Sequence, residues 1–262
     1  MPYVDTHAHI FLQSLPMAAN RRYTPGYDCP TEHYLAQLSE NDVGFGVLVQ
    51  PSFLGTDNTY MLSALDRYPD RLRGIAVVAP DISDADLDFM DRSGVVGIRF
   101  NMIGKAISEL GNAEVASLLK RIDQLNWQVE IQAHGRDLPE VFRHLERFQG
   151  AVVIDHFGLP DPQAGVRDQG FRALLSEAAG GRVFVKMSAG YRCGEMDVAT
   201  CAGALLAVAG PRRLVWGSDW PFTQFEKNRH YSGMMNTLRR WVPEKIARDI
   251  MDATAMELFR FT

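Results

Sequence analysis

The sequence predicts a distorted (β/α)8 TIM barrel that spans residues 1–262 as a single domain. Three observations lead to this fold class. The chain holds eight short apolar or β-branched runs, amphipathic helical stretches lie between them, and its 262 residues contain no linker, repeat or charge block. The competing architecture is an open doubly wound sheet. No Gly-x-Gly-x-x-Gly motif or P-loop follows any of the runs, which favours the barrel.

The expected strands share a length of five to eight residues and a high content of apolar side chains. In chain order they are Tyr3–His9, Val43–Gln50, Leu72–Val78, Val95–Asn101, Gln128–His134, Val152–His156, Val183–Ser188 and Leu214–Ser218.

Helix signals fill the intervals between these strands. Ser83 and Asp86 form a capping box at the start of one helix. Gly150 is the expected C-cap of another. Pro243 is expected to open a last helix that continues to Leu258.

Composition limits the partners. Apolar residues make up 46% of the chain and charged residues 23%, and the net charge is −5 with a pI near 5.8. This balance argues against nucleic acid or an anionic membrane as a partner, and no stretch is apolar for long enough to span a bilayer. Cys29, Cys193 and Cys201 form no Cys-x-x-Cys motif or disulfide framework, so a cytoplasmic protein is expected. Whether barrels pair into a homo-oligomer stays open.

Two motifs at opposite ends of the chain carry the chemistry. His7 and His9 stand two residues apart in an extended run, so both imidazoles point the same way. Asp219 follows the last expected strand. A lone His-x-His pair is more often structural, but the first and last strands of a barrel are neighbours. The two histidines and the aspartate are therefore expected to meet.

Further polar residues follow other expected strands, at the end where barrels hold their active sites. Arg99 is more plausibly an anion clamp than a salt-bridge partner, because a guanidinium binds carboxylates in a bidentate way. Asp155 is expected to orient a neighbour, since His156 alternates to the opposite face. For His134 two roles are equally expected: a metal ligand, or a strand-end residue whose ring caps the next turn.

Four weaker candidates for substrate binding lie in loops. A long segment after the first strand, of the kind that often forms a lid, contains one of them. Another is a serine placed to donate a hydrogen bond, and the last two are loop cations. The four are Tyr23, Ser52, Lys105 and Arg192.

Several blocks together resemble the amidohydrolase superfamily, its amidohydrolase-2 branch, and within that branch the 2-pyrone-4,6-dicarboxylate lactonase group. The similarity runs nearly end to end and implies a hydrolase that opens, or reversibly closes, a carboxylated lactone. The blocks are residues 5–9, 50–58, 97–101, 155–156 and 217–221.

The resemblance also implies roles for residues. The histidines His7, His9 and His156 surround the lactone carbonyl, and Asp219 acts as the general base. The residues that hold the substrate's anionic groups match Tyr23, Ser52, Arg99, Lys105 and Arg192. In two places the chain departs from the group's pattern, with Lys105 in place of an arginine and Gln132 in place of a tyrosine. Either change is compatible with a different acid as substrate.

The resemblance leaves the cofactor open. Many relatives bind one Zn²⁺, and the matching ligands here are His7, His9, His134 and Asp219. The lactonase group works without a metal, so the preferred expectation is that no cofactor is required, with a single Zn²⁺ as the alternative. Arg99 stands where the superfamily has a lysine or glutamate that bridges two metals, which argues against a binuclear centre.

The mechanism sets one requirement on Asp219. A group that first accepts and then returns a proton needs a pKa raised toward neutrality, which burial favours and nearby cations oppose. Three other functions remain: a lactone isomerase of sugar diacids, a Zn²⁺-dependent decarboxylase of the same branch, and a barrel that binds acids without turnover. The complete set of acid–base residues makes the last the weakest.

Overall fold

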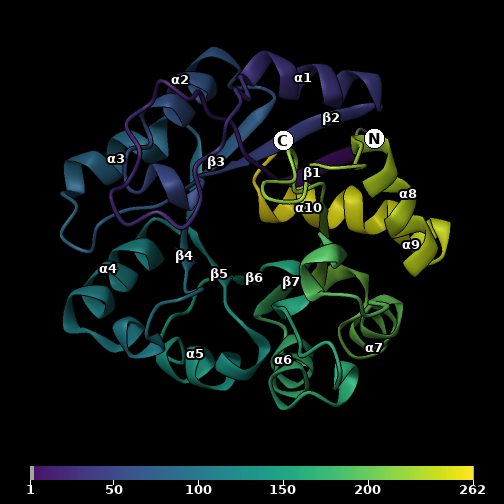
Figure 1. Cartoon of the computed structure of the whole chain (residues 1–262). Helices are drawn as coiled ribbons and strands as arrows, with labels where there is room; N and C mark the ends of the chain where they lie inside the picture. The colour runs from purple at the N-terminus through teal and green to yellow at the C-terminus, as the bar shows by residue number, and fades with distance from the viewer. Residues whose placement is uncertain (1–2, 262) are drawn as a thin grey trace.

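The computed structural model describes residues 3–261 and contains eight parallel strands in the order β1 to β8, ringed by helices (Figure 1). All eight expected strands and the barrel fold are confirmed, although several strands end one or two residues early. Their bounds are β1 (Tyr3–Ala8), β2 (Val43–Val49), β3 (Leu72–Ala76), β4 (Val95–Asn101), β5 (Gln128–Gln132), β6 (Val152–Ile154), β7 (Val183–Ser188) and β8 (Leu214–Gly217).

The barrel closes between β1 and β8 through individual hydrogen bonds. The amide of Asp219 donates to the carbonyl of His7, and the amide of His9 donates to the carbonyl of Trp220, both at 2.8 Å. On its other side β1 pairs with β2, and the register shifts between Asp5 and Ala8. Such a shift changes the direction in which strand side chains point. One of the irregularities of the barrel therefore lies around His7.

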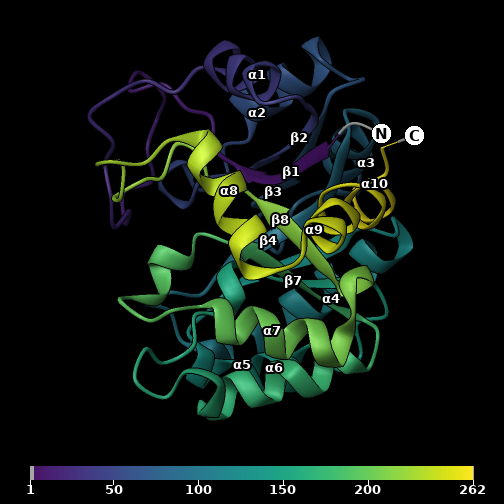
Figure 2. The same cartoon turned by 90° about the vertical axis from the view of Figure 1, so that its right-hand side faces the viewer.

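Helices cover the outside of the barrel (Figures 1 and 2). Their bounds are α1 (Thr31–Glu40), α2 (Thr59–Arg67), α3 (Asp84–Arg92), α4 (Ala113–Gln124), α5 (Leu138–His144), α6 (Gln169–Ala179), α7 (Ala199–Ala209), α8 (Tyr231–Trp241), α9 (Glu244–Met251) and α10 (Ala253–Leu258). Short 3₁₀ turns are η1 (Ser52–Leu54), η2 (Ile107–Gly111), η3 (Gly135–Asp137), η4 (His156–Gly158), η5 (Gly165–Arg167), η6 (Gly190–Cys193) and η7 (Pro211–Arg213).

The helix-end predictions are confirmed in part. Ser83 caps α3, and its hydroxyl accepts a hydrogen bond from the amide of Asp86 at 3.1 Å. The prediction for Gly150 is wrong, because α5 ends at His144 and the amide of Gly150 donates to Asp123. The single last helix is also wrong. It breaks into α9 and α10 at Asp252, whose φ and ψ of −115° and −96° are not helical.

The two ends of the barrel differ in character. Val4, Val47 and Val215 line its N-terminal end and pack with Phe259 and Phe261 from the end of the chain. Apolar side chains therefore close this end. Within residues 3–261 no helix is both long and apolar enough to cross a membrane.

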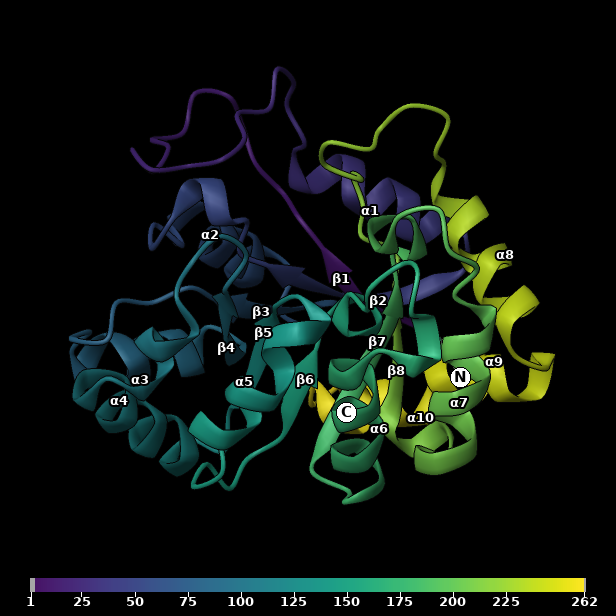
Figure 3. The same ribbon diagram turned by 60° about the horizontal axis from the view of Figure 1, so that its bottom comes forward.

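Long segments rise above the opposite end of the strands (Figure 3). One connects β1 to α1 and the other connects β8 to α8. The hydroxyls of Tyr23 and Tyr27, from the first segment, both donate to the Glu226 Oε1 of the second at 2.8 Å. This contact ties the two segments together over the C-terminal end, where the polar residues gather.

Candidate active site

Three imidazoles converge on one carboxylate oxygen at the C-terminal end of the barrel. The Oδ1 atom of Asp219 lies 3.7 Å from Nε2 of His7, 3.9 Å from Nε2 of His9 and 3.8 Å from Nε2 of His156. All four side chains are buried. The closure of β8 on β1 thus brings the two ends of the chain together, as the sequence predicted, and β6 adds the third histidine.

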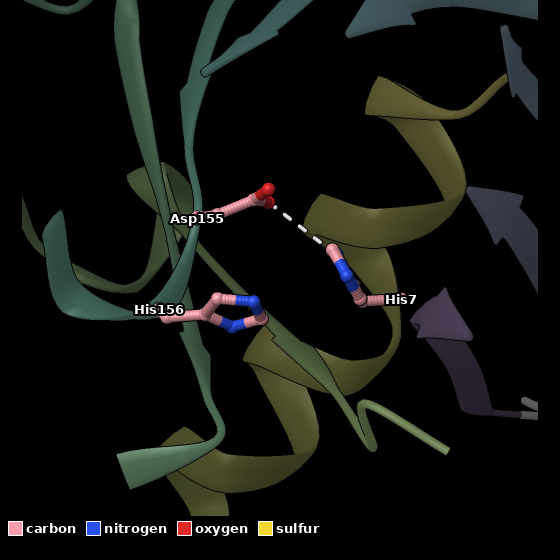
Figure 4. Close-up of side chains that lie close together, drawn as sticks. All are labelled: His7, Asp155 and His156. Carbon is pink, nitrogen blue, oxygen red and sulfur yellow. Dashed lines mark ion pairs between the residues drawn. The ribbon is translucent and has the colours of Figure 1, made fainter. Parts of the chain in front are cut away.

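Backbone turns at the strand ends aim two of these residues inward. His156 and Asp219 have φ values of 51° and 61°, in the left-handed region that few non-glycine residues adopt. Strand β6 ends at Ile154, so strict alternation no longer applies to the residues after it. Asp155 and His156 both line this centre, and the prediction that they face opposite ways is wrong (Figure 4).

The buried carboxylate of Asp5 holds the strands of this centre in place, and the sequence reasoning gave it no role. Asp5 accepts hydrogen bonds from the amide and hydroxyl of Ser218 at 2.8 and 2.6 Å. It also accepts from the hydroxyls of Tyr34 at 3.1 Å and Tyr231 at 2.9 Å. These bonds join β1 and α1 to α8 and the segment after β8. Asp5 opens the block of residues 5–9 that also contains His7 and His9, and this position is the sequence signal that could have indicated its role.

The contacts of Nδ1 indicate what His7 and His9 present at Nε2. Nδ1 of His9 lies 2.7 Å from the carbonyl of Val49 and must donate to it, which leaves a lone pair on Nε2 of the neutral ring. Nδ1 of His7 lies 3.0 Å from Nζ of Lys186, an ammonium that can only donate. His7 therefore carries its proton on Nε2. The two neighbouring rings present opposite polarity to the centre.

Lys186 belongs to a layer of charged residues buried inside the barrel. Its Nζ atom lies 2.7 Å from Oε1 of Glu130 and 3.5 Å from Oδ1 of Asp155. That same Asp155 oxygen is 3.3 Å from Nδ1 of His7, and the two side chains face one another (Figure 4). Lys186 is closer to this nitrogen, and the Asp155 oxygen makes no hydrogen bond within residues 3–261. Nδ1 of His7 therefore has a donor and a carboxylate acceptor beside it, and the shorter contact, with Lys186, favours a proton on Nε2.

Burial and charge keep the histidines neutral. Burial, followed by the charge of Lys186, holds the pKa of His7 well below its usual value. Burial, followed by Arg99, lowers the pKa of His9 to about 4. Burial also lowers the pKa of His156 to about 4, although Asp219 opposes the shift. At neutral pH all three rings are uncharged.

The expectation of a raised pKa for Asp219 is wrong for the free protein. Burial raises the pKa of this carboxyl, but Arg192 and the surrounding histidines outweigh burial and hold the pKa below its ordinary value. Nε of Arg192 and the hydroxyl of Tyr191 donate to its Oδ2 at 2.7 and 2.6 Å. Asp219 is therefore ionised, with Oδ1 free of hydrogen bonds within residues 3–261.

A cavity of about 200 Å³ opens above this centre. His9, His156 and Asp219 line it, and His7 lies buried beneath. The cavity also contains four of the five residues expected to bind substrate, namely Tyr23, Ser52, Arg99 and Arg192. The fifth, Lys105, lines a neighbouring cavity instead.

Partners within the protein already occupy several of these residues. Arg99 donates from Nε and Nη2 to Asp155, and from Nη2 to Oε1 of Gln132 at 2.7 Å. Arg192 pairs with Asp219. Arg99 is thus a salt-bridge partner as well as a residue of the cavity wall, although the sequence reasoning set that role aside.

Two groups of side chains lie close enough to hold a metal ion: His7 with His9 and Asp219, and His7 with Asp155 and His156. His134 belongs to neither group and lies exposed at the cavity wall. Both groups need a lone pair on a ring nitrogen of His7, and a ligating histidine normally donates its other nitrogen to a carboxylate or carbonyl. Nδ1 of His7 has a carboxylate of this kind, Oδ1 of Asp155, at 3.3 Å, but the ammonium of Lys186 is closer, at 3.0 Å. The donor positions suit a metal, whereas the contact with Lys186 favours a proton on Nε2 of His7 and so opposes one.

The low pKa values of His9 and His156 predict where activity falls on the acidic side of the pH–rate profile. A kcat/KM that reports the free enzyme is expected to stay level from about pH 7 to about pH 5 and to fall through about pH 4. Activity is lost as the pH falls, because protonation removes the lone pair of His9 and adds charge to the centre. Steady-state kinetics from pH 3.5 to 8, with circular dichroism as a control for unfolding, measures this limb. A limb centred near the ordinary histidine pKa of about 6.5 would contradict these assignments.

Comparison with known proteins identifies one family and relatives named as lactone hydrolases. The family model described as Amidohydrolase matches residues 4–261. The 2-pyrone-4,6-dicarboxylate hydrolase of Comamonas testosteroni is 30% identical over 250 residues, which cover 88% of this chain and 81% of that protein. The 4-sulfomuconolactone hydrolase of Hydrogenophaga intermedia is 30% identical over 84% of this chain and 75% of its own length.

A solved structure shows the same architecture. The protein from Acinetobacter baumannii, described as a probable 2-pyrone-4,6-dicarboxylic acid hydrolase with citric acid bound, superposes with a TM-score of 0.95. It is 34% identical, and the match covers all of both chains.

Proposed function

The chain belongs to the amidohydrolase family, and from that membership we propose that it is a hydrolase that opens the ring of an anionic lactone with water. One observation carries the proposal: three neutral imidazoles and one ionised carboxylate converge beneath a cavity whose wall contains arginines. The names of the two relatives are those of hydrolases of a dicarboxylated and a sulfonated lactone. Cations in the wall suit substrates of this charge.

The carbonyl oxygen of the lactone would face His7. A ring with its proton on Nε2 donates to that oxygen and stabilises the negative charge that develops when water attacks. Lys186 keeps the proton there by donating to Nδ1 at 3.0 Å. His156, whose Nδ1 lies 2.8 Å from the hydroxyl of Ser188, is held beside it as a second polar contact.

Asp219 would act as the general base. Its free Oδ1 accepts a proton from water as the water oxygen bonds to the carbonyl carbon, and the lone pair of His9 helps to orient that water. The tetrahedral intermediate then collapses as the bond to the ring oxygen breaks. Asp219 returns its proton to the leaving oxygen, which becomes a hydroxyl, and the new carboxylic acid releases its remaining water proton to the solvent to give the carboxylate of the open chain.

Arg192 would couple substrate binding to the strength of this base. In the free protein its guanidinium holds the pKa of Asp219 down. An anionic substituent of the substrate competes for the same guanidinium, which also lies 3.2 Å from the carbonyl of Thr223. As Arg192 turns toward the substrate, the carboxylate becomes more basic. A proton acceptor that is too weak in the free protein becomes effective in the complex.

We propose that this reaction needs no metal. The protonation of His7 supports this, and so does the charge balance. Around the centre Arg99, Lys186 and Arg192 offset Glu130, Asp155 and Asp219. A divalent cation would add two buried positive charges to this balanced set. A single Zn²⁺ on His7, His9 and Asp219 is the alternative.

We propose that the substrate is a small carboxylated molecule.

The proposed compartment is the cytoplasm. Cys29, Cys193 and Cys201 are all buried and free, which agrees with a reducing environment.

Ring opening of 2-pyrone-4,6-dicarboxylate, followed by ultraviolet absorbance, tests the proposed function. The untreated protein and the protein freed of metal by a chelator are expected to turn over at the same rate, and added zinc is expected to give no increase. Turnover that is lost on chelation and restored by zinc would overturn the metal-free proposal. If this substrate, 4-sulfomuconolactone and other anionic lactones all remain closed, the lactone hydrolase proposal fails.

A further inference from the structure

A second cavity adjoins the one above the histidines. It measures about 330 Å³, and Val78, Ala79 and Lys105 are among the residues that line it. Five residues line both cavities and so mark the place where they join. These are Arg22, Ser52, Arg99, Asn101 and Ile103.

Arg22 is an exposed cation of this junction that pairs with no carboxylate among the described residues. It comes from the segment between β1 and α1 and donates from Nη2 to Oδ1 of Asn101 at 3.3 Å. Within residues 3–261 no carboxylate oxygen lies within 4.0 Å of its guanidinium. The other two arginines of the central cavity, Arg99 and Arg192, each pair with an aspartate. In the free protein each of these two charges is already shared with a carboxylate.

Two other residues that line both cavities have donors to spare. Nη1 of Arg99 and the hydroxyl of Ser52 make no hydrogen bond within the described part of the chain. Partial burial, followed by the charge of Arg99, lowers the pKa of Arg22, so the two guanidiniums act on one another across the junction. Two neighbouring positive charges repel each other. A bound anion reduces this repulsion and accepts hydrogen bonds from the free donors, so the two guanidiniums form a site for an anion.

We propose that Arg22, with Ser52 and Nη1 of Arg99, binds an anionic substituent of the substrate at the junction of the two cavities. This inference rests on the proposed function and adds a specificity-determining residue to it. Arg22 is absent from both groups of potential metal ligands and makes no hydrogen bond with the histidines or Asp219. It is therefore expected to affect the binding of the substrate more than the chemical step.

Replacement of Arg22 by methionine tests the inference. The substitution keeps much of the length of the side chain and removes its charge and donors. With 2-pyrone-4,6-dicarboxylate as substrate, KM is expected to rise about tenfold or more, while kcat stays within about twofold. Arg22→Lys is expected to recover part of the loss. Arg147→Met is the matched control, because Arg147 is exposed and lines neither cavity.

A binding measurement separates this inference from the proposed function. Calorimetry with citrate, the acid present in the Acinetobacter structure, is expected to give a Kd about tenfold higher for Arg22→Met than for the unaltered protein. If no lactone is opened but this loss of citrate binding is seen, the lactonase proposal fails and the anion site stands. An unchanged KM together with an unchanged Kd would overturn the site. A fall in kcat at constant KM and Kd would overturn it as well, since it would place Arg22 in the chemical step.

Discussion

Replacement of Asp219 by asparagine is expected to lower kcat for lactone opening by about a thousandfold while leaving the Kd for citrate within about threefold. The amide cannot accept the proton of the attacking water, and it cannot return one to the leaving oxygen. The free Oδ1 of Asp219 is the only carboxylate oxygen, among the described residues, that lies within 4.0 Å of all three Nε2 atoms. Within residues 3–261 no other carboxylate is therefore placed to take over its role.

Single-turnover kinetics and citrate calorimetry measure these two effects on the same protein. Glu195→Gln is the matched control, because Glu195 is an exposed acid in the segment that follows β7. The general-base assignment is wrong if Asp219→Asn retains a tenth or more of the activity. A variant that loses citrate binding as well as turnover would instead point to collapse of the pocket around Arg192.

Replacement of Lys186 by methionine is expected to reduce the free energy of unfolding by about 3–5 kcal/mol. Lys186 and Glu130 are both fully buried, and their charges lie 2.7 Å apart. Removal of the ammonium leaves the carboxylates of Glu130 and Asp155 without their shared partner inside the barrel. Burial already raises the pKa of Glu130 to about 7, so its charge is costly even with the lysine present.

Urea denaturation of three proteins tests this prediction: Lys186→Met, Glu130→Gln and the double variant. The double variant is expected to be more stable than Lys186→Met alone, because it has no unpaired Glu130 charge. If Lys186→Met does not fold, the comparison of Glu130→Gln with the double variant gives the cost of removing Lys186 when the Glu130 charge is absent, and that cost is expected to be below about 3–5 kcal/mol. A loss below about 1 kcal/mol would show that the buried charges are not coupled as the distances imply.

The barrel could be predicted from sequence because its signals are local and repeated. Each strand is a short apolar run, and closure of the first strand on the last follows from the fold class. This closure is enough to predict from sequence that His7, His9 and Asp219 lie together, as they do. The direction of a side chain just beyond a strand end was harder to predict. His156, whose φ is 51°, turns to the same centre as Asp155 and not to the opposite face.

The charged layer could not be predicted, because it depends on contacts between distant strands. Lys186 and Glu130 read as ordinary polar residues in two strand-like runs, and only the closed barrel brings them to 2.7 Å. The pairing of Arg99 with Asp155 was hidden for the same reason. Lys105 lies in a loop, and it lines the second cavity instead of the central one because of the path of the chain after β4. Arg22 was overlooked beside Tyr23 because nothing in the segment indicates that it reaches β4.

The central claim is that water opens the lactone ring. The most direct test is to let the protein open 2-pyrone-4,6-dicarboxylate in water enriched in oxygen-18 and to measure the mass of the first product. A hydrolase places one heavy oxygen in the new carboxylate for each ring opened. A product with no heavy oxygen would contradict the account, because ring transfer within the substrate, as in a lactone isomerase, takes no oxygen from water.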